Sequence, residues 1–217
     1  MMMRLLSSAA IAALTIASPA AAQDVIIYNA KIALGDGSEP IESGAVVIDD
    51  GKVVYAGTGQ DRTFETDTLI DAQGAWVTPG IFATVTTLGL WDVSAVQQSN
   101  DIRASDAPFS AALDTAPIVN PNSQHILIHR AAGITRAATT TSPSSSIFGG
   151  QGAIIDLDAD SNPVMRARAF QTVALGESGG RIAGGSRAAA HTLFRNALRE
   201  ASELGDAARI GGGSLRS

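Results

Sequence analysis

Three histidines are the residues of this chain best suited to bind a metal or to move a proton: His125, His129 and His191. His125 and His129 are four residues apart, so a helix would place both imidazoles on one face, where such a pair can bind zinc. The familiar helical zinc motif has a glutamate after the first histidine, whereas Ile126 stands here. We therefore interpret the pair as packing or surface residues in preference to metal ligands, and His191 as structural.

Two further segments contain residue types that can bind an ion, but their sequence patterns do not match those of known ion-binding loops. Asp156, Asp158 and Asp160 alternate as calcium ligands can, but the segment lacks the glycine and the closing glutamate of a calcium-binding loop. A solvated strand end followed by a turn is the preferred interpretation. The glycine-rich residues 149–152 could cradle a phosphate, but they precede an apolar run instead of opening a helix. We expect a turn there.

Serine and arginine side chains are the remaining candidates for catalysis or substrate binding. Ser144, Ser145 and Ser146 lack the strand-turn-helix context of a nucleophilic serine. Arg166 and Arg168 can steer an anionic substrate, although surface arginines are the simpler interpretation. No cysteine is present, which excludes a disulfide, a thiolate metal site and a cysteine nucleophile.

The composition is that of a globular chain of 217 residues, 45% hydrophobic and 17% charged. Its formal net charge of −6 argues against nucleic acid and anionic membrane surfaces as partners. A small-molecule partner is the remaining expectation if the protein is active, and the oligomeric state stays open.

The first 22 residues have the pattern of a secretory signal peptide. Arg4 precedes an apolar run at residues 5–16, Pro19 breaks it, and three alanines end at Ala22. This pattern predicts cleavage between Ala22 and Gln23, and the small residues argue against the alternative of an uncleaved membrane anchor. No later stretch reaches the roughly 18 apolar residues of a membrane span. We expect an exported, periplasmic protein that leaves the membrane after cleavage.

Short strands are expected in the first part of the mature chain, at residues 24–33, 44–49, 52–55 and 68–72. Asp50-Gly51 lies between two apolar runs, which predicts a type I′ hairpin turn because both central residues of that turn need positive φ. These elements predict a β domain over residues 23–78.

Beyond Pro79-Gly80 the pattern changes to strands and helices. Residues 81–90 are rich in β-branched side chains and predict a buried strand. We expect a short helix within 107–116, a helix at 124–132 capped by Ser123, strands at 134–139 and 153–157, and a helix at 187–204. The last helix has an apolar stripe of Ala189, Leu193, Ala197, Leu198 and Ala201. Alternating strands and helices predict βα units.

The segment Val77-Thr78-Pro79-Gly80 resembles the amidohydrolase superfamily of metal-dependent hydrolases. In that family the segment continues to a His-x-His pair that binds the catalytic metal at the end of the first barrel strand. Aligned on these four residues, Val85 and Thr87 occupy the two histidine positions. Four later segments, residues 108–114, 130–135, 149–153 and 186–190, resemble an exported bacterial branch in which these histidines are also replaced by small or hydroxyl residues.

The resemblance implies an α/β fold with a composite N-terminal β-sandwich, followed at residues 79–217 by the first units of an incomplete TIM (β/α)₈ barrel. A complete barrel takes about 250 residues. The resemblance thus covers the N-terminal part of the family fold only. The family's later metal ligands, a modified lysine, two histidines and an aspartate, would lie beyond residue 217.

The implied activity of the intact form is hydrolysis of a C–N bond in a cyclic amide or dipeptide-like molecule by metal-activated water. This chain alone is expected to bind no cofactor, whereas zinc or another divalent metal is implied for a full-length protein. The alternatives are a metal-free exported binding or scaffold protein and a complete small α/β domain. Thr84, Thr86 and Thr87 are candidates for a substrate pocket, ordinary interior residues being the other interpretation, and the catalytic residues stay unknown.

Overall fold

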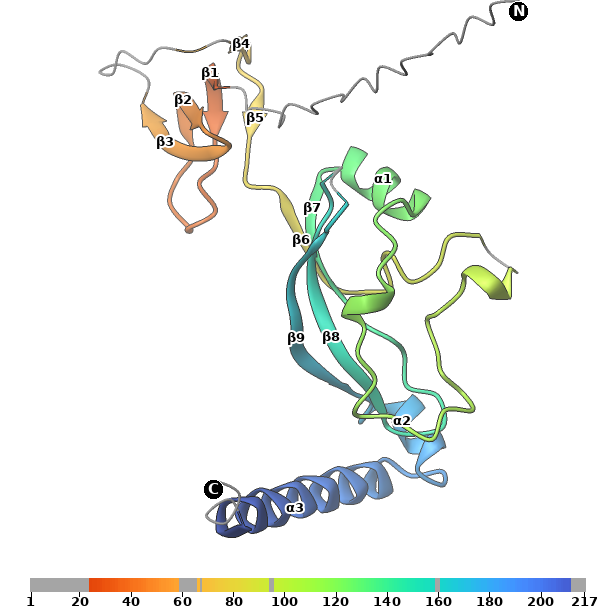
Figure 1. Cartoon of the computed structure of the whole chain (residues 1–217). Coiled ribbons are helices and arrows are strands. Elements are labelled where there is room, and N and C mark those ends of the chain that lie inside the picture. Colours follow the sequence, from red (N-terminus) through yellow and green to blue (C-terminus); the bar gives the residue numbers. More distant parts are fainter. Residues whose placement is uncertain (1–23, 59–65, 67, 94–95, 159–160, 212–217) are drawn as a thin grey trace, which may run out of the picture. The chain divides into compact units, whose positions relative to one another are not determined.

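The computed structural model describes residues 24–58, 66, 68–93, 96–158 and 161–211, with side chains in the last helix described as far as residue 205. The predicted cleavage site at Ala22 and Gln23 lies outside the described residues. The chain divides into two compact units, residues 1–79 and 80–217, at the Pro79-Gly80 break (Figure 1).

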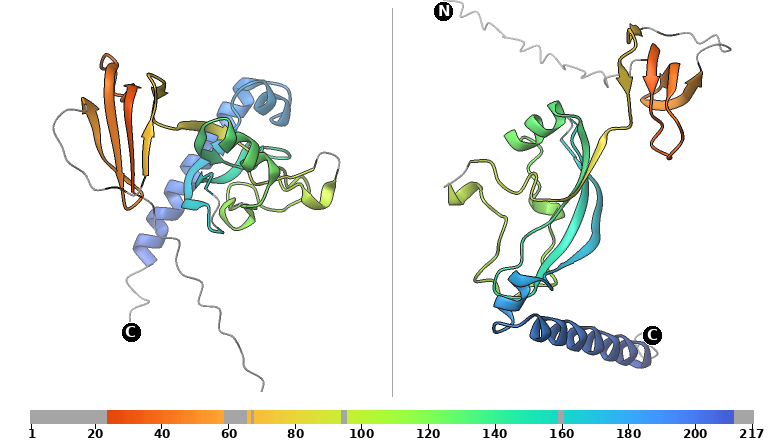
Figure 2. Two further views of the ribbon diagram at one scale, coloured as in Figure 1. Left: turned by 90° about the horizontal axis from the view of Figure 1, so that it is seen from above. Right: turned by 180° about the vertical axis from the view of Figure 1, so that it is seen from behind.

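The N-terminal unit is one mixed sheet with the strand order β3-β2-β1-β4, and β5 also pairs with β1 (Figure 2). β2 is antiparallel to both of its neighbours, whereas β4 and β5 run parallel to β1. All four strands expected in this region are present. The strands are β1 (Val25–Ile32), β2 (Ile41–Asp49), β3 (Lys52–Thr58), β4 (Thr68–Asp71) and β5 (Trp76–Val77).

The turn between β2 and β3 has the predicted type I′ conformation. Asp50 has φ of 49° and Gly51 has φ of 71°, so both central residues lie in the left-handed region. This turn sets the pairing of Asp49 with Lys52 and, through it, the hairpin register.

The core cluster of this unit contains the buried Ala30, Ile32 and Val46. Val53, Leu69 and Trp76 remain exposed in the same unit. Among the described residues this unit has a single sheet, so the second layer of the expected sandwich is absent from them.

The C-terminal unit has a four-stranded sheet in the order β6-β7-β8-β9. β6 and β7 are parallel and α1 lies in the connection between them, which is one βα unit as expected. The expectation of further βα units is wrong, because β8 is antiparallel to both β7 and β9. The elements are β6 (Ile81–Thr86), α1 (Gln124–Ala131), β7 (Ile134–Thr139), β8 (Phe148–Asp156) and β9 (Val164–Val173).

Two local expectations in this unit need correction, and one strand lies where none was expected. The glycine-rich residues 149–152 belong to β8 and do not form a turn. β9 was not anticipated. Residues 107–115 contain no helix, and the helical turns of the region are the 3₁₀ segments η1 (Gln97–Ser99) and η2 (Ala116–Ile118).

β6 is less buried than its β-branched composition suggests. Val85 is 76% exposed, and Ile81 and Phe82 are also exposed. The reason is that β6 is the edge strand of this sheet, with a partner on one side only among the described residues. Residues 88–90, expected to extend the strand, form a buried turn instead.

Two helices end the described chain: α2 (Glu177–Ile182) and α3 (Arg187–Gly211). α3 is longer than expected, and most of its predicted apolar stripe, including Leu193 and Leu198, is exposed. Its packing comes from the buried Ala190 and from Phe194, whose ring centroid lies 6.2 Å from that of Phe148. No described helix is both long enough and apolar enough to cross a membrane.

The core of the C-terminal unit fixes α1 against β7 and β8. Ile126 of α1, Ala137 of β7 and Ile155 of β8 are almost fully buried in one cluster with Leu88. Because Leu88 follows β6 directly, this cluster also holds the end of β6 in place.

Candidate functional site

Three strands of the C-terminal unit end at the same edge of the sheet. β6 and β7 are parallel, and β9 has the direction of β7 because β8 is antiparallel to both. In open α/β sheets, ligands bind in the space outside the carboxyl ends of the strands. The segments that follow these strands, residues 87–123, 140–147 and 174–186, are therefore where a site is expected.

Two threonines tie the ends of β6 and β7 together. The Thr86 hydroxyl donates a hydrogen bond to the Ala138 carbonyl at 3.0 Å, and the buried Thr139 hydroxyl donates to the Leu88 carbonyl at 2.8 Å. Thr86, a sequence candidate for a substrate pocket, is thus engaged with the backbone. Thr84 is exposed and Thr87 is half-buried, so the structure does not gather the three candidates into one site.

A second group of hydroxyls follows β7, and sequence reasoning missed it. Thr140 Oγ1 and Thr172 Oγ1 are 2.6 Å apart and share a hydrogen bond, and the buried Thr141 hydroxyl donates to the Gly149 carbonyl. These bonds join the end of β7 to β8 and β9. The run of threonines at the predicted strand end was the available signal.

The histidine pair on α1 is engaged in local packing. The rings of His125 and Trp91 have centroids 3.9 Å apart, and His125 Nε2 lies 3.1 Å from the Asp92 carbonyl oxygen. His129 Nδ1 lies 2.7 Å from the His125 carbonyl oxygen. One nitrogen of each ring therefore faces a backbone carbonyl, which favours the packing interpretation. His191 is exposed on α3.

Ser123 precedes α1 as expected, but its hydroxyl makes no cap hydrogen bond and instead donates to the Trp91 carbonyl at 2.9 Å. The Asp92 carboxylate accepts from the Gln124 backbone N–H at 2.9 Å and caps the helix in its place. The segment after β6 thereby holds the start of α1.

The residues of this edge do not fit a catalytic divalent metal. Such a metal needs imidazole or carboxylate ligands that converge on one point, and Val85 and Thr87 supply neither. Across the part of the chain that the structure describes, no cluster of three or more histidine, cysteine or acidic side chains is placed to hold a metal. Asp158 turns back on Asp156, whose carboxylate accepts its backbone N–H at 3.2 Å, and Asp160 lies outside the described residues.

Arg168 is paired and is not a free steering arginine. Its Nε donates to Asp114 Oδ2 at 2.7 Å, and the other oxygen of Asp114 accepts from the Ala116 backbone N–H at 3.1 Å. The hydrogen bond from Arg168 holds the pKa of Asp114 below its ordinary value. Arg166 is exposed on β9, two residues before it. The neighbouring Thr115 hydroxyl is buried and has no hydrogen-bond partner among the described residues.

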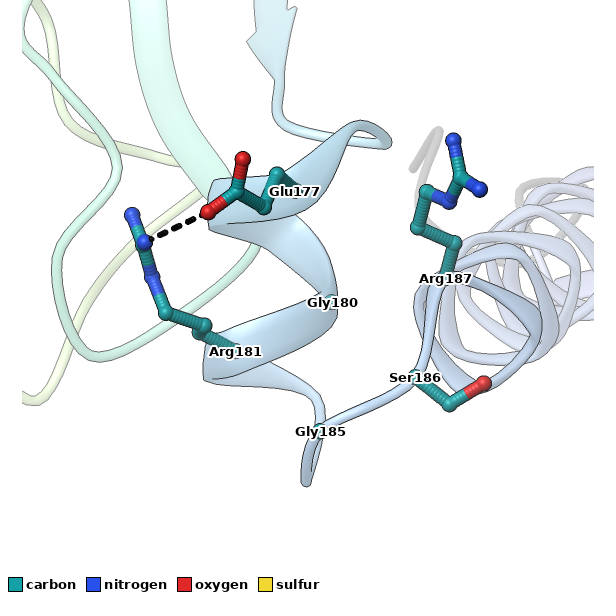
Figure 3. Close-up of a pocket in the computed structure, with 6 residues that line it drawn as sticks. All are labelled: Glu177, Gly180, Arg181, Gly185, Ser186 and Arg187. Atoms are coloured by element: carbon teal, nitrogen blue, oxygen red, sulfur yellow. Dashed lines mark hydrogen bonds and ion pairs between the residues drawn. The ribbon is translucent and has the colours of Figure 1, made fainter.

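Two hollows flank α2 at this edge. The first, of about 520 Å³, opens between α2 and the start of α3, and Figure 3 shows its lining. The second, of about 440 Å³, combines residues from all three segments that follow β6, β7 and β9. It is lined by Arg103, Ser105, Pro143, Ser144, Ser145, Ser178, Arg181 and Ile182.

Comparison with known proteins identifies the fold. No protein-family profile and no curated protein sequence match this chain. Among solved structures, an amidohydrolase from Thermotoga maritima MSB8 matches with a TM-score of 0.73 and 18% sequence identity. The match covers 89% of this chain and 51% of that protein, so this chain spans about half its length. The expected resemblance to the N-terminal part of an amidohydrolase is thus confirmed at the level of the fold.

Two further structures match over shorter segments. A molinate hydrolase shares 28% identity over 32% of this chain and 15% of its own, with a TM-score of 0.29. The L-hydantoinase (dihydropyrimidinase) of Arthrobacter aurescens shares 26% identity over 34% of this chain and 15% of its own, with a TM-score of 0.26. At these TM-scores the two matches carry no argument about this chain.

Proposed function

We propose that this chain is the N-terminal portion of an exported hydrolase with the amidohydrolase fold, which in its intact form hydrolyses a C–N bond of a small cyclic amide or dipeptide-like molecule. The observation that carries the proposal is the fold match over 89% of this chain and 51% of the Thermotoga protein. Export is supported by the signal-like pattern of residues 1–22.

In this proposal the chain supplies a framework and one wall of the substrate site. The core around Ile126 and Ile155 fixes the strands, and the Thr86 and Thr139 hydroxyls hold two strand ends at a constant separation. The groups that activate water would come from the remaining half of the fold, because the described residues do not fit a divalent metal.

A second candidate function is supported by one observation. Val85 and Thr87 stand where the family resemblance places two metal-binding histidines. A protein that has lost those ligands can still bind a small molecule at the carboxyl ends of its strands. The second candidate is therefore a metal-free exported binding or scaffold protein.

The test uses the native protein purified from the cell envelope, with the recombinant chain of residues 23–217 as the matched control. Both are assayed against cyclic amides and N-acyl amino acids, and the metal content of both is measured. The proposal expects hydrolysis by the native protein and none by the recombinant chain. A folded native protein that neither hydrolyses any of these amides nor retains metal would overturn the hydrolase proposal and support the binding protein.

The same purified material tests export. Cleavage at the predicted position leaves Gln23 as the first residue, which N-terminal sequencing or peptide mass analysis detects. A native protein that starts at Met1 would contradict the proposed processing.

A further inference from the structure

We propose that the hollow lined by Arg103, Ser144, Ser145, Ser178 and Arg181 binds a small oxyanion group, a carboxylate or a phosphate. The site goes beyond the proposed hydrolysis and does not depend on it. Binding is therefore testable on this chain alone, whatever the activity of the intact protein.

The hollow is built from three segments that come together at the carboxyl edge of the sheet. Arg103 follows β6, Ser144 and Ser145 follow β7, and Ser178 and Arg181 follow β9. This is the edge at which α/β sheets bind their ligands. The three strands deliver the two arginines and the serines to one place, although the segments are distant in the sequence.

Hydrogen bonds hold the three segments together. The Ser142 backbone N–H donates to the Ile102 carbonyl at 2.8 Å, and the Ser144 hydroxyl reaches the Ala104 carbonyl at 3.3 Å. The Ala174 N–H donates to the Ile147 carbonyl at 2.8 Å and joins the segment after β9 to the segment after β7. The lining is thus formed by the fold itself.

The lining has donors for an anion and no acidic side chain. It contains two guanidinium groups and the serine hydroxyls of Ser105, Ser145 and Ser178, together with that of Ser144, which already donates to the Ala104 carbonyl. A guanidinium presents a planar fork of N–H donors that matches the oxygens of a carboxylate or phosphate, and a serine hydroxyl adds a further donor. The volume of about 440 Å³ fits a small molecule that carries one such group.

Two acidic side chains stand next to this hollow and oppose binding. Arg181 Nη1 lies 2.9 Å from Glu177 Oε1, in an exposed ion pair. Asp106 lines the adjoining hollow together with Arg103. Exposed ion pairs are weak, so an anion in the hollow competes with Glu177 for Arg181 at little cost. This arrangement predicts that removing the Glu177 charge strengthens anion binding.

Arg187 offers a matched control. It lines the hollow between α2 and α3, and Figure 3 shows the Arg181 side chain extending from α2 away from Arg187. Both arginines are exposed and lie six positions apart in the sequence. Only Arg181 lines the proposed site.

The experiment is calorimetric titration of the chain of residues 23–217 with inorganic phosphate and, separately, with N-acetylglycine at low ionic strength. We expect saturable binding of at least one probe, weakened about tenfold or more by R103Q or R181Q, because each change removes a charged donor fork. R103K keeps the charge without the fork and should fall between wild type and R103Q. E177Q should tighten binding roughly twofold to threefold, and R187Q should leave it within about twofold.

The preferred probe identifies the source of the oxyanion. Tighter phosphate binding assigns the site to free phosphate or a phosphate ester, and tighter N-acetylglycine binding assigns it to a carboxylate-bearing molecule. If neither probe binds at concentrations up to about 10 mM, the dissociation constant is too weak for a preformed anion site, and the proposal is overturned. Equal binding by wild type and R103Q, with circular dichroism confirming that both are folded, would also overturn it.

Discussion

Arg168 Nε donates a hydrogen bond to Asp114 Oδ2 across 2.7 Å, joining two residues that are 54 positions apart in the sequence. Arg168 has φ of 50°, in the left-handed region, and lies where the pairing register of β8 and β9 shifts between Gly152 and Ile154. An irregularity of this kind re-aims a side chain. Here it brings the guanidinium to the loop that precedes η2.

The first prediction concerns the coupling between Asp114 and Arg168. A double-mutant cycle of D114N, R168Q and the double variant should give a coupling free energy of about 0.2–1 kcal/mol, because the Arg168 side chain is 69% exposed and water screens the pair. Urea unfolding of the four proteins measures it. Strictly additive effects of the two substitutions would show that the pair contributes nothing to stability.

The second prediction concerns pH. The folded pKa of Asp114 is lowered, chiefly by the hydrogen bond from Arg168, so the pair stabilises the fold above the unfolded pKa of about 3.9. The contribution is lost as the pH falls through the folded pKa. The difference in unfolding free energy between wild type and D114N should therefore be constant from about pH 7 to pH 5 and shrink below about pH 4. A difference that grows on acidification would contradict this sign.

The third prediction concerns Gly152 of β8. A Cβ at this position would collide with the ring of Phe170, its partner across the β8–β9 pair. G152A should destabilise the fold by about 1–3 kcal/mol through overpacking. G205A is the control, because a Cβ on Gly205 in α3 meets no atom within 4 Å and alanine favours a helix by up to about 1 kcal/mol. Thermal unfolding of both variants should shift in opposite directions, and equal shifts would refute the packing argument.

The local elements were predictable from the sequence because short-range rules determine them. Asp50-Gly51 specified the hairpin turn through the positive φ that both positions adopt. Gly133, with φ of 90°, ends α1 close to the predicted residue. These features depend on the conformational preferences of one or two residues, and tertiary contacts do not override them.

The sheet of the C-terminal unit was mispredicted after β7, because the strand expected at residues 153–157 left residues 140–152 for the connection, whereas β8 begins at Phe148. Residues 140–147 connect β7 to β8, and a parallel crossover needs a dozen or more residues. The short loop therefore forces β8 to turn back. The glycines of β8 misled the prediction because glycine weakens strands in general, whereas here Phe170 lies over Gly152 and Leu113 approaches Gly150.

Most of the candidate site could not be predicted from the sequence. Ser144 and Ser145 were considered only as nucleophiles, and Arg103 and Arg181 were not considered. Nothing in their local sequence shows that three strand ends bring them to one hollow. The direction of β9, which delivers Arg181, depends on the two antiparallel pairings of β8.

The fourth prediction concerns the edge strand β6. Ile81, Phe82 and Val85 are exposed on a strand that has one partner among the described residues, which favours association of the isolated chain through this edge. Sedimentation of the chain of residues 23–217 should show concentration-dependent association. The V85K variant should reduce it, whereas T84K, a change at an exposed neighbour whose side chain faces the other side of the same strand, should reduce it less. A wild-type chain that stays monomeric at high concentration would contradict this prediction.

The intact mass of the native protein in the cell envelope tests the proposed function most directly. This sequence has a mass of 22.2 kDa, and it spans 51% of the Thermotoga protein that shares its fold. We predict a native mass about twice that of this chain, or a stable complex of that size with a second polypeptide that supplies the rest of the fold. A native monomer with the mass of residues 23–217 alone would contradict the proposal.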